Sequence, residues 1–559
     1  MSDARPSMSP GRNGRRITRR ELLTAVGGAL AIAAVAPHLG PGPAQAQTPK
    51  RGGVLRLTVI SDPLHFDPHQ TISFLTMVPL SFVYSRLVKV KAGPSVKPMT
   101  YPIEPDLAES WTQPNDTTYI FKLRKGVRWH PKPPVNGREL TAADVKYTYE
   151  RFLSIQGNPN KPVLEYVDKI EALDTHTVKF TLKEPNAWFL DLLASTSTWI
   201  VARECVEKFG DLKKVESAVG TGPWMLERWE PNVKLVYVRN PNYFLAGLPY
   251  ADGVDVLIDK DPSSRLAAWL GGKTDFGPEY QHAVRWLDVP VARQRKPGLQ
   301  TAEYTWLTGG SIGFKLSIPP FGDLRVRRAL SRASNLAEIF ESLAFSQGRW
   351  TPNPAVPAAF ADWSIPIDQL GPEGRRLYEP STAEAKRLLA EAGYPNGFKT
   401  TVEAPGTGYG PDFDDFVQIT LRNWKAAGID AELKLREYGA FISSAIFGKF
   451  DQMFIGLRGA WADPEAYFYR WFMPGQRLNV WGVDDPKLTE MIKLQRRTFD
   501  VAKRKQVVFD IQRYLADQAL FGADGSIRIL SAWDAHIKNY MPNNGFDYGG
   551  RLMAAWIDK

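Results

Sequence analysis

The 559-residue sequence contains a single cysteine, Cys205. One cysteine excludes an intramolecular disulfide and any metal cluster built from several thiolates. We expect Cys205 to be a buried structural thiol, and a catalytic thiol is the alternative.

Long apolar runs are also missing. Beyond residue 46, no segment reaches 18 uninterrupted apolar residues, which excludes an integral membrane protein. Near the N-terminus, the basic pair Arg19-Arg20 precedes a short apolar stretch from Leu22 to Ala36 and the small-residue site Ala44-Gln45-Ala46. This order predicts an export signal peptide over residues 1–46, and the arginine pair resembles a twin-arginine motif. No cysteine stands at the end of this stretch, where a lipid would be attached, so we expect a soluble periplasmic protein without a lipid anchor.

Nucleic-acid binding has no support in the charge pattern. The net charge is +10, of which the first 46 residues contribute +4. The remaining excess is mild for a chain of this length, and no dense Lys/Arg run carries interleaved aromatic residues. With 43% hydrophobic and 23% charged residues, the chain has enough apolar material for several globular units.

The first half of the sequence predicts strands separated by helices. An early strand lies in "GGVLRLTVISDP" (52–63), and alternating apolar residues predict further strands over 119–123 and 178–182. Between these two, Thr141 with Asp144 three residues later marks the start of a helix that runs to Leu153. This alternation predicts an α/β lobe.

The second half predicts its own α/β sheet. Ser381 and Glu384 form a capping-box pattern for a helix that ends at Gly393. A strand over 399–403, a helix over 412–427 and a strand over 429–438 follow, which is the spacing of a right-handed parallel crossover. Two helices, over 486–499 and 501–520, and a short strand over 527–531 complete the pattern.

Several motifs suggest catalysis or metal binding but lack the required context. Gly309 to Gly313 matches G-x-S-x-G around Ser311, yet the following "FKLSIPP" predicts a strand ending in prolines and not the helix of a hydrolase. His65 and His69 have helical metal-site spacing, but Pro68 lies between them and favours a loop. The glycines at 406–410 complete no nucleotide motif. We therefore predict no catalytic residue, no metal site and no cofactor.

Eight stretches occur in the same order as in one known family. They are "PDLAESW" (105–111), "YIFKLRKGVRWH" (119–130), "LTAADVKYTYERF" (140–152), "GTGPW" (220–224), "RNPNYF" (239–244), "LRVRRALSRA" (324–333), "LLAEAGYPNGF" (388–398) and "WADPEAYF" (461–468). Together they resemble the extracellular solute-binding proteins of family 5, the peptide/nickel class that serves ABC importers. The resemblance covers essentially all of residues 50–559.

The resemblance implies an α/β fold of the two-lobed periplasmic binding protein kind, type II, with the extra subdomain of the peptide-binding class. It assigns residues 50–88, 218–298 and 530–559 to the first subdomain of lobe 1, 89–217 to the second, and 299–529 to lobe 2. The chain then crosses between lobes near Gln300 and Leu530, and such short crossings suit a hinge. It also implies a small-molecule ligand, permease subunits as partners and a monomer.

The charged groups that hold a free peptide in the peptide-binding relatives have no counterpart here. There, an acidic residue three positions before an Asp-Pro pair holds the α-amine, and an arginine two positions before a loop tyrosine holds the carboxylate. The corresponding residues are Ala460, before Asp463-Pro464, and Thr407, before Tyr409. An unpaired end of a zwitterion in a dry cleft costs about 1 to 3 kcal/mol, which disfavours free di- and tripeptides.

The candidate cleft residues are mostly aromatic: His65, Phe66, Trp306, Tyr409, Arg458 and Trp461. For each aromatic residue, packing in the core is the alternative, and Arg458 is either a ligand clamp or a salt-bridge member. Aromatic faces with few charges suit an oligosaccharide or glycoside, or a modified peptide or opine-like compound. The function predicted is solute capture for an ABC importer. The alternatives are a periplasmic hydrolase using Ser311 and a non-transport chaperone or sensor on the same fold.

Overall fold

A computed structural model describes residues 48–344, 349–406, 409, 411–457, 459, 461, 463–520 and 524–559. The predicted leader (1–46), Arg458, Ala460 and Thr407 lie outside these residues. All the sheets below belong to one compact unit, Pro49–Lys559. No helix in the described part of the chain combines the length and apolar character that a membrane span requires.

The first sheet contains the predicted early strand. Its four strands are ordered β1-β10-β9-β8, with β1 parallel to β10 and the other pairs antiparallel. Their bounds are β1 Val54–Val59, β8 Trp224–Glu230, β9 Lys234–Arg239 and β10 Gly253–Ile258. Leu55 and Leu57 of β1 are fully buried, so this face of the strand contributes to the core.

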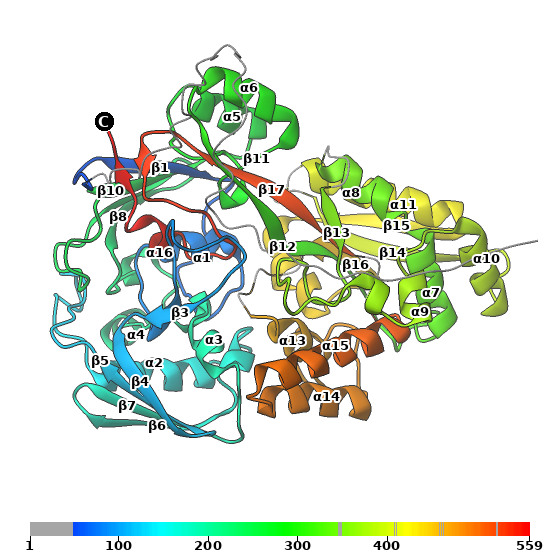
Figure 1. The fold of residues 1–559 in the computed structure, drawn as a ribbon, viewed down its shortest axis with the longest axis horizontal. Helices are drawn as coiled ribbons and strands as arrows, with labels where there is room; N and C mark the ends of the chain where they lie inside the picture. The colour runs from blue at the N-terminus through cyan, green and yellow to red at the C-terminus, as the bar shows by residue number, and fades with distance from the viewer. Residues whose placement is uncertain are drawn as a thin grey trace, which may run out of the picture. The chain divides into compact units, whose positions relative to one another are not determined.

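The second sheet is antiparallel and is ordered β4-β5-β7-β6. Its strands are β4 Ala108–Asn115, β5 Thr118–Leu123, β6 Val167–Asp174 and β7 Thr177–Leu182, which confirms the two strands predicted from alternation. Helix α2 (Ala142–Ser154) packs on this sheet (Figure 1), and its start is confirmed because the backbone N–H of Thr141 donates to Asp144 at 2.8 Å. The alternating apolar side chains of β5 and β7 are buried beneath it.

The glycines of "GTGPW" allow two backbones to touch. A Cβ on Gly222 would lie 2.5 Å from the carbonyl carbon of Val83, and one on Gly220 would lie 2.1 Å from its carbonyl oxygen. Val83 follows helix α1 (Phe74–Leu80), and its carbonyl accepts a 2.8 Å hydrogen bond from the N–H of Gly222. Any side chain at these two positions would separate the segments.

The third sheet has seven strands, ordered β11-β17-β12-β16-β14-β15, with β13 also paired to β17. Their bounds are β11 Ala283–Val284, β12 Gln300–Phe314, β13 Trp350–Pro352, β14 Phe398–Pro405, β15 Ile429–Arg436, β16 Met453–Leu457 and β17 Gly525–Trp533. β14 and β15 are parallel, with α11 (Pro411–Ala426) between them, so the predicted crossover is confirmed. The prediction of a strand over the residues that follow Gly313 is wrong, because β12 ends at Phe314.

Helices surround this sheet (Figure 1). The longer ones are α7 Leu324–Ala333, α8 Leu336–Ala344, α10 Thr382–Glu391, α14 Pro486–Arg497 and α15 Val501–Asp517. Those predicted near 381, 486 and 501 are confirmed. Shorter helices include α3 Phe189–Leu193, α4 Arg203–Phe209, α5 Pro262–Leu270, α6 Val289–Arg295, α9 Pro372–Arg376, α12 Tyr438–Ser443, α13 Ala466–Phe472 and α16 Tyr548–Leu552.

The two segments that are predicted to cross between the lobes, near Gln300 and Leu530, lie side by side. β12 and β17 pair antiparallel, with Gln300 opposite Trp533 and Glu303 opposite Leu530 (Figure 1). The regular pairing stops between Thr305 and Gly309. Farther along, β12 pairs with β16 instead.

Candidate functional site

Two adjoining cavities of about 190 and 130 Å³ lie where segments on both sides of the β12–β17 pair meet. We call them together the main cavity. Residues shared by both linings include Glu279 and Tyr280 from the segment before β11, Trp306 and Thr308 from β12, and Tyr409 and Leu457. The walls of the cavity therefore include residues on both sides of Gln300 in the sequence, and a concave site of this kind can enclose a ligand.

Aromatic rings dominate this lining. They include Tyr280, Trp306, Tyr409, Tyr438, Trp461 and Trp471. Tyr280 and Trp306 face each other across the two sides, with ring centres 5.8 Å apart. Flat apolar faces of this kind favour a ligand with an apolar body that can stack.

An irregularity in β12 places Trp306 in the lining. Residues 306–308 have no partners on β17, and Asn544 fills the interruption: its amide donates to the carbonyl of Thr305 at 3.0 Å and its oxygen accepts from the N–H of Leu307 at 3.0 Å. A bulge of this kind redirects side chains. The indole Nε1 of Trp306 is buried and has no hydrogen-bond partner among the described residues.

Tyr409 and Trp461 also line the main cavity, as two further candidates from the sequence. The Tyr409 ring packs against Phe413 at 4.9 Å and Tyr438 at 5.5 Å, and burial raises the pKa of its hydroxyl well above the usual value. Trp461 precedes α13 and is only 8% exposed. The guanidinium carbon of Arg470 lies 4.9 Å from the Trp461 ring centre and supports one side of it.

Phe66 and His65 do not line the main cavity. Phe66 belongs to the core, with its ring 5.3 Å from that of Trp229, and it does not line the main cavity. The ring of His65 accepts a hydrogen bond from the N–H of Asp67 and is likewise absent from the lining. Burial is the main reason that the pKa of His65 is lowered. Arg458 is outside the described residues.

Two charged groups of the lining have partners of opposite charge. Arg265 donates to both carboxylate oxygens of Glu279, at 2.9 and 2.7 Å, and Arg528 lies 3.4 Å from Glu303. Arg265 and Tyr280 were not predicted from the sequence, because no periodic pattern marks the segment that holds Tyr280. The paired charges leave a lining that is mainly apolar.

Helices α13 and α14 contact the segment around 165–188. The indole of Trp188 donates to Gln495 at 2.6 Å, and the ring of Tyr166 lies 5.3 Å from that of Tyr469. The buried pair Arg496 and Glu465 lies at the same contact. The contact thus joins segments that are about 300 residues apart in sequence.

The two nucleophiles that the sequence singled out, Ser311 and Cys205, are both buried. Ser311 is buried within β12, opposite Gly456 of β16, so the strand–turn–helix that a hydrolase nucleophile needs is not formed there. Cys205 is buried, as predicted, and burial raises the pKa of its thiol to about 12. His69 lies in a loop, as predicted, and is buried against Arg151 at 2.8 Å.

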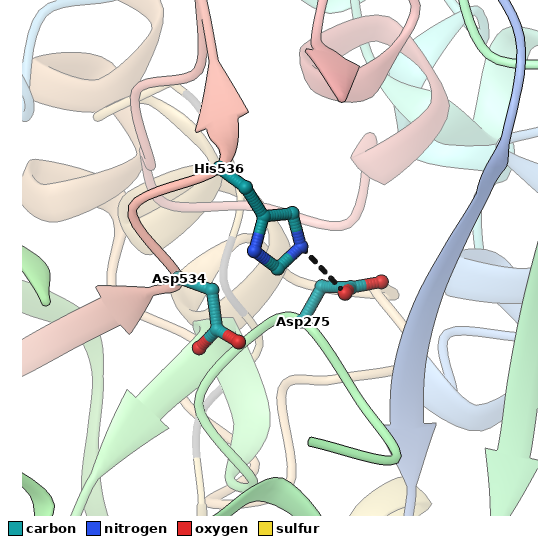
Figure 2. Close-up of side chains that lie close together, drawn as sticks. All are labelled: Asp275, Asp534 and His536. Carbon is teal, nitrogen blue, oxygen red and sulfur yellow. Dashed lines mark hydrogen bonds and ion pairs between the residues drawn. The ribbon is translucent and has the colours of Figure 1, made fainter. Parts of the chain in front are cut away.

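One group of carboxylate and imidazole side chains outside the cavity has ligand atoms within 4.8 Å of one another: Asp275, Asp534 and His536 (Figure 2). Protein cations already bind the carboxylates. Arg56 lies 2.8 Å from Asp275, and Lys296 lies 2.8 Å from Asp534. The group therefore has the composition of a salt-bridge network.

The chain matches known proteins over most of its length. Residues 102–479 match the model of "Bacterial extracellular solute-binding proteins, family 5 Middle". Di/tripeptide-binding protein 1 of Pseudomonas aeruginosa is 28% identical over 488 residues, covering 82% of this chain and 86% of that protein. The dipeptide-binding protein of Escherichia coli is 27% identical over 466 residues, covering 78% and 82%.

Solved structures share the fold. The periplasmic binding protein DppA from Helicobacter pylori, in complex with the peptide STSA, has a TM-score of 0.78 at 24% identity and covers 91% of this chain and 99% of its own. The mixed α/β architecture is thus that of the periplasmic binding proteins, as the sequence predicted. The family model spans well over half of the chain, and the chain belongs to the bacterial extracellular solute-binding proteins of family 5.

Proposed function

We propose that this protein is the periplasmic receptor of an ABC importer, which encloses a small solute in the main cavity and delivers it to the membrane permease. The observation that carries the proposal is the main cavity itself, whose aromatic walls come from both sides of the paired strands β12 and β17. Such a site binds and releases a solute by moving its two walls.

The sheets support the proposed division into lobes. The first sheet falls within residues 50–88 and 218–298, and the second falls within 89–217. The third lies in 299–529, apart from β11 and the end of β17. Under this proposal β12 and β17 form the hinge, and a ligand favours the closed form by its higher affinity for it.

For the ligand, we propose a compound with an apolar body: a glycoside or oligosaccharide first, and a modified peptide or opine-like compound second. Arg265 and Glu279 of the lining pair with each other, and the lining is mainly apolar, which favours a ligand without charged ends. Free di- or tripeptides are the second candidate, which the names of the two curated relatives favour.

Native mass spectrometry of the protein as purified tests whether it carries a solute, and titration calorimetry then compares three probes. These are N-acetyl-Phe-Ala-amide, phenyl β-D-glucoside and free Phe-Ala. We expect a neutral probe to bind with a Kd of about 1 µM, and free Phe-Ala to bind at least tenfold more weakly. Tighter binding of free Phe-Ala would select the second candidate.

Substitution of Trp306 tests the place of binding. Trp306→Ala removes part of the cavity wall and is expected to raise the Kd of the probe that binds at least tenfold. The matched control is Trp111→Ala, a tryptophan of β4 that packs against Phe121 and lies outside the lining. Equal affinities for the two variants would place binding somewhere other than the main cavity.

We also propose export by the twin-arginine route, from the pair Arg19-Arg20. Lysines at both positions are expected to keep the protein out of the periplasmic fraction, while lysine at Arg15 and Arg16 leaves export unchanged. Gel filtration with light scattering tests the expected monomer.

A further inference from the structure

The turn that carries Tyr280 has an unusual backbone. Gln281 has φ 62° and ψ 24°, and His282 has φ 57°, so two consecutive residues with side chains adopt the left-handed conformation. This conformation is sterically unfavourable for residues other than glycine. The turn is tight, because the N–H of Glu279 donates to the carbonyl of Ala283 at 3.0 Å. Strained residues persist only where their surroundings hold them, and they gather at ligand-binding and switch regions.

Four hydrogen bonds hold Gln281, which is only 1% exposed. Its backbone N–H donates to the hydroxyl of Tyr548 at 2.7 Å, and its side-chain Nε2 donates to the carbonyl of Gly545 at 2.9 Å. Its Oε1 accepts from Arg551 at 3.0 Å, and its carbonyl accepts from the hydroxyl of Ser531 at 2.6 Å. Backbone and side chain are therefore both fixed, which is what a strained conformation needs in order to persist.

The bond to Ser531 connects the turn to the paired strands. Ser531 lies in β17, between Ala283 of β11 and Ala302 of β12. Its hydroxyl, which donates to Gln281, also lies 3.0 Å from the hydroxyl of Tyr304 in β12. The turn is thus joined by hydrogen bonds to both strands of the proposed hinge.

Tyr280, on the other side of Gln281, belongs to the cavity wall. It lines both parts of the main cavity, and its ring centre lies 5.8 Å from that of Trp306 and 4.9 Å from that of Phe74. Because the peptide bond between Tyr280 and Gln281 is planar, the orientation of Gln281 constrains the direction in which the chain enters Tyr280. A single residue therefore separates the cavity wall from the bond to β17.

We propose that Gln281 is a positioning residue, which holds Tyr280 in the cavity wall and couples that wall to strand β17. The inference rests on the proposed function and deepens it, because movement at the hinge is passed to Tyr280 through Gln281. A ligand that contacts Tyr280 in one arrangement of β12 and β17 favours that arrangement by its higher affinity for it.

A double-mutant cycle tests the positioning role. Calorimetry uses whichever of N-acetyl-Phe-Ala-amide and phenyl β-D-glucoside binds the wild type more tightly. Gln281→Gly still allows the left-handed conformation but removes two side-chain hydrogen bonds, and it is expected to raise the Kd about tenfold. In Tyr280→Ala protein the same change should alter the Kd less than about twofold, because the residue that Gln281 positions is gone. A tenfold loss in both backgrounds would show a general structural role and overturn the inference.

Two further variants sharpen this test. Asn539→Gly is the matched control: Asn539 has φ 55°, its side chain donates to the carbonyl of Ala554 at 2.8 Å, and it lies outside the lining. It should leave the Kd unchanged, and a loss equal to that of Gln281→Gly would contradict the inference. Ser531→Ala removes only the bond between the turn and β17 and is expected to raise the Kd about threefold, again only when Tyr280 is present. It decides the question if Gln281→Gly fails to fold.

Fluorine NMR measures the positioning without a ligand. In protein labelled with 3-fluorotyrosine, the Tyr280 resonance is assigned by its absence from Tyr280→Phe. We expect this resonance to shift in Gln281→Gly and in Ser531→Ala and to keep its place in Asn539→Gly. A Tyr280 resonance that moves in neither of the first two variants would refute the inference and leave the proposed function standing. If no probe binds and no solute is carried, the proposed function fails, while the resonance still shows whether Gln281 positions Tyr280.

Discussion

The guanidinium carbon of Arg496 lies 3.9 Å from the ring centre of Tyr166, across the contact between α14 and the segment before β6. The ring centre of Tyr469 lies 3.5 Å from the same carbon, and the Nε of Arg496 donates to Glu465. Arg496 and Glu465 are both about 1% exposed. A buried cation that contacts two rings therefore joins α14 to the segment before β6.

Arg496→Met is expected to destabilise the protein by about 3 to 5 kcal/mol, because Glu465 would stay buried without its cation. Urea unfolding monitored by circular dichroism measures this. Its control is Arg497→Met, the neighbouring residue of α14, whose side chain is 44% exposed and pairs with Glu490. The control should change stability by less than about 0.5 kcal/mol. Similar losses in both variants would contradict the role of burial.

Tyr166→Ala is expected to favour the open form, because Tyr166 contacts Arg496 but does not line the main cavity. Because a smaller fraction of the molecules is closed, the apparent affinity for the bound probe falls, although no contact with the ligand has been removed. Small-angle scattering without ligand should show a larger radius of gyration than for the wild type. An unchanged radius together with weaker binding would count against this explanation.

Asp463 is expected to make stability fall as pH rises. Burial raises the pKa of Asp463 to about 7, whereas an unfolded chain has a value near 3.9. Between pH 4 and 7 the folded state keeps a proton that the unfolded state has released, so stability decreases with pH across this window. The free energy of unfolding of Asp463→Asn, relative to that of the wild type, should therefore rise by about 1.4 kcal/mol per pH unit from pH 4.5 to 6.5.

Asp485→Asn is the control of opposite sign. Burial opposes ionisation of Asp485, but hydrogen bonds from Tyr514 and from two backbone N–H groups lower its pKa. Its contribution is present at neutral pH and is lost as pH falls. Unfolding curves at several pH values should thus show the two variants diverging, and parallel behaviour would disprove the assignment.

His130 should make the protein acid-sensitive. Burial lowers the pKa of His130 to about 4, and its ring lies between the carbonyl of Gly222 and the N–H of Gly220. The unfolded state, with a pKa near 6.5, binds the proton first, so stability is lost as pH falls from 6.5 to 4. His130→Asn should lose less stability over this window, by about 1.4 kcal/mol per pH unit. Identical slopes for variant and wild type would rule this out.

Gly222→Ala is expected to destabilise by about 2 kcal/mol or more, because the added methyl group would meet the backbone of Val83 at 2.5 Å. Gly371→Ala is the control. Gly371 has φ −61°, and the nearest atom to an added Cβ lies 3.5 Å away. Thermal melts should show a clear loss for the first variant and less than about 1 kcal/mol for the second.

Local patterns were sufficient to predict those helices and strands whose own residues carry a clear periodicity or cap. Alternation at Tyr119, Phe121 and Leu123 and the cap at Thr141 depend on residues a few positions apart, so the sequence carries them directly. The same holds for the parallel pair β14 and β15, whose connecting helix is bounded by its own stop signal, Gly428.

The candidate site was predicted only in part, since contacts distant in sequence decide which side chains face the cavity. Phe66 packs against Trp229, which lies more than 160 residues later, and no local pattern at Phe66 indicates this. Trp306 lines the cavity because Asn544 interrupts the pairing of β12 and β17. Tyr280 was missed for the same reason: its position depends on the strands it meets.

The pairing of residues 300–305 with 528–533 also limits how the protein moves. Two strands joined by ladder hydrogen bonds flex easily across their flat face, while bending within that plane would stretch one strand's bonds and compress the other's. If β12 and β17 form the hinge, as proposed, this pair of strands defines a single axis of rotation between the lobes and resists sideways shear. Every capture event would then end in one shape, so a membrane partner could distinguish loaded from unloaded receptors by geometry alone.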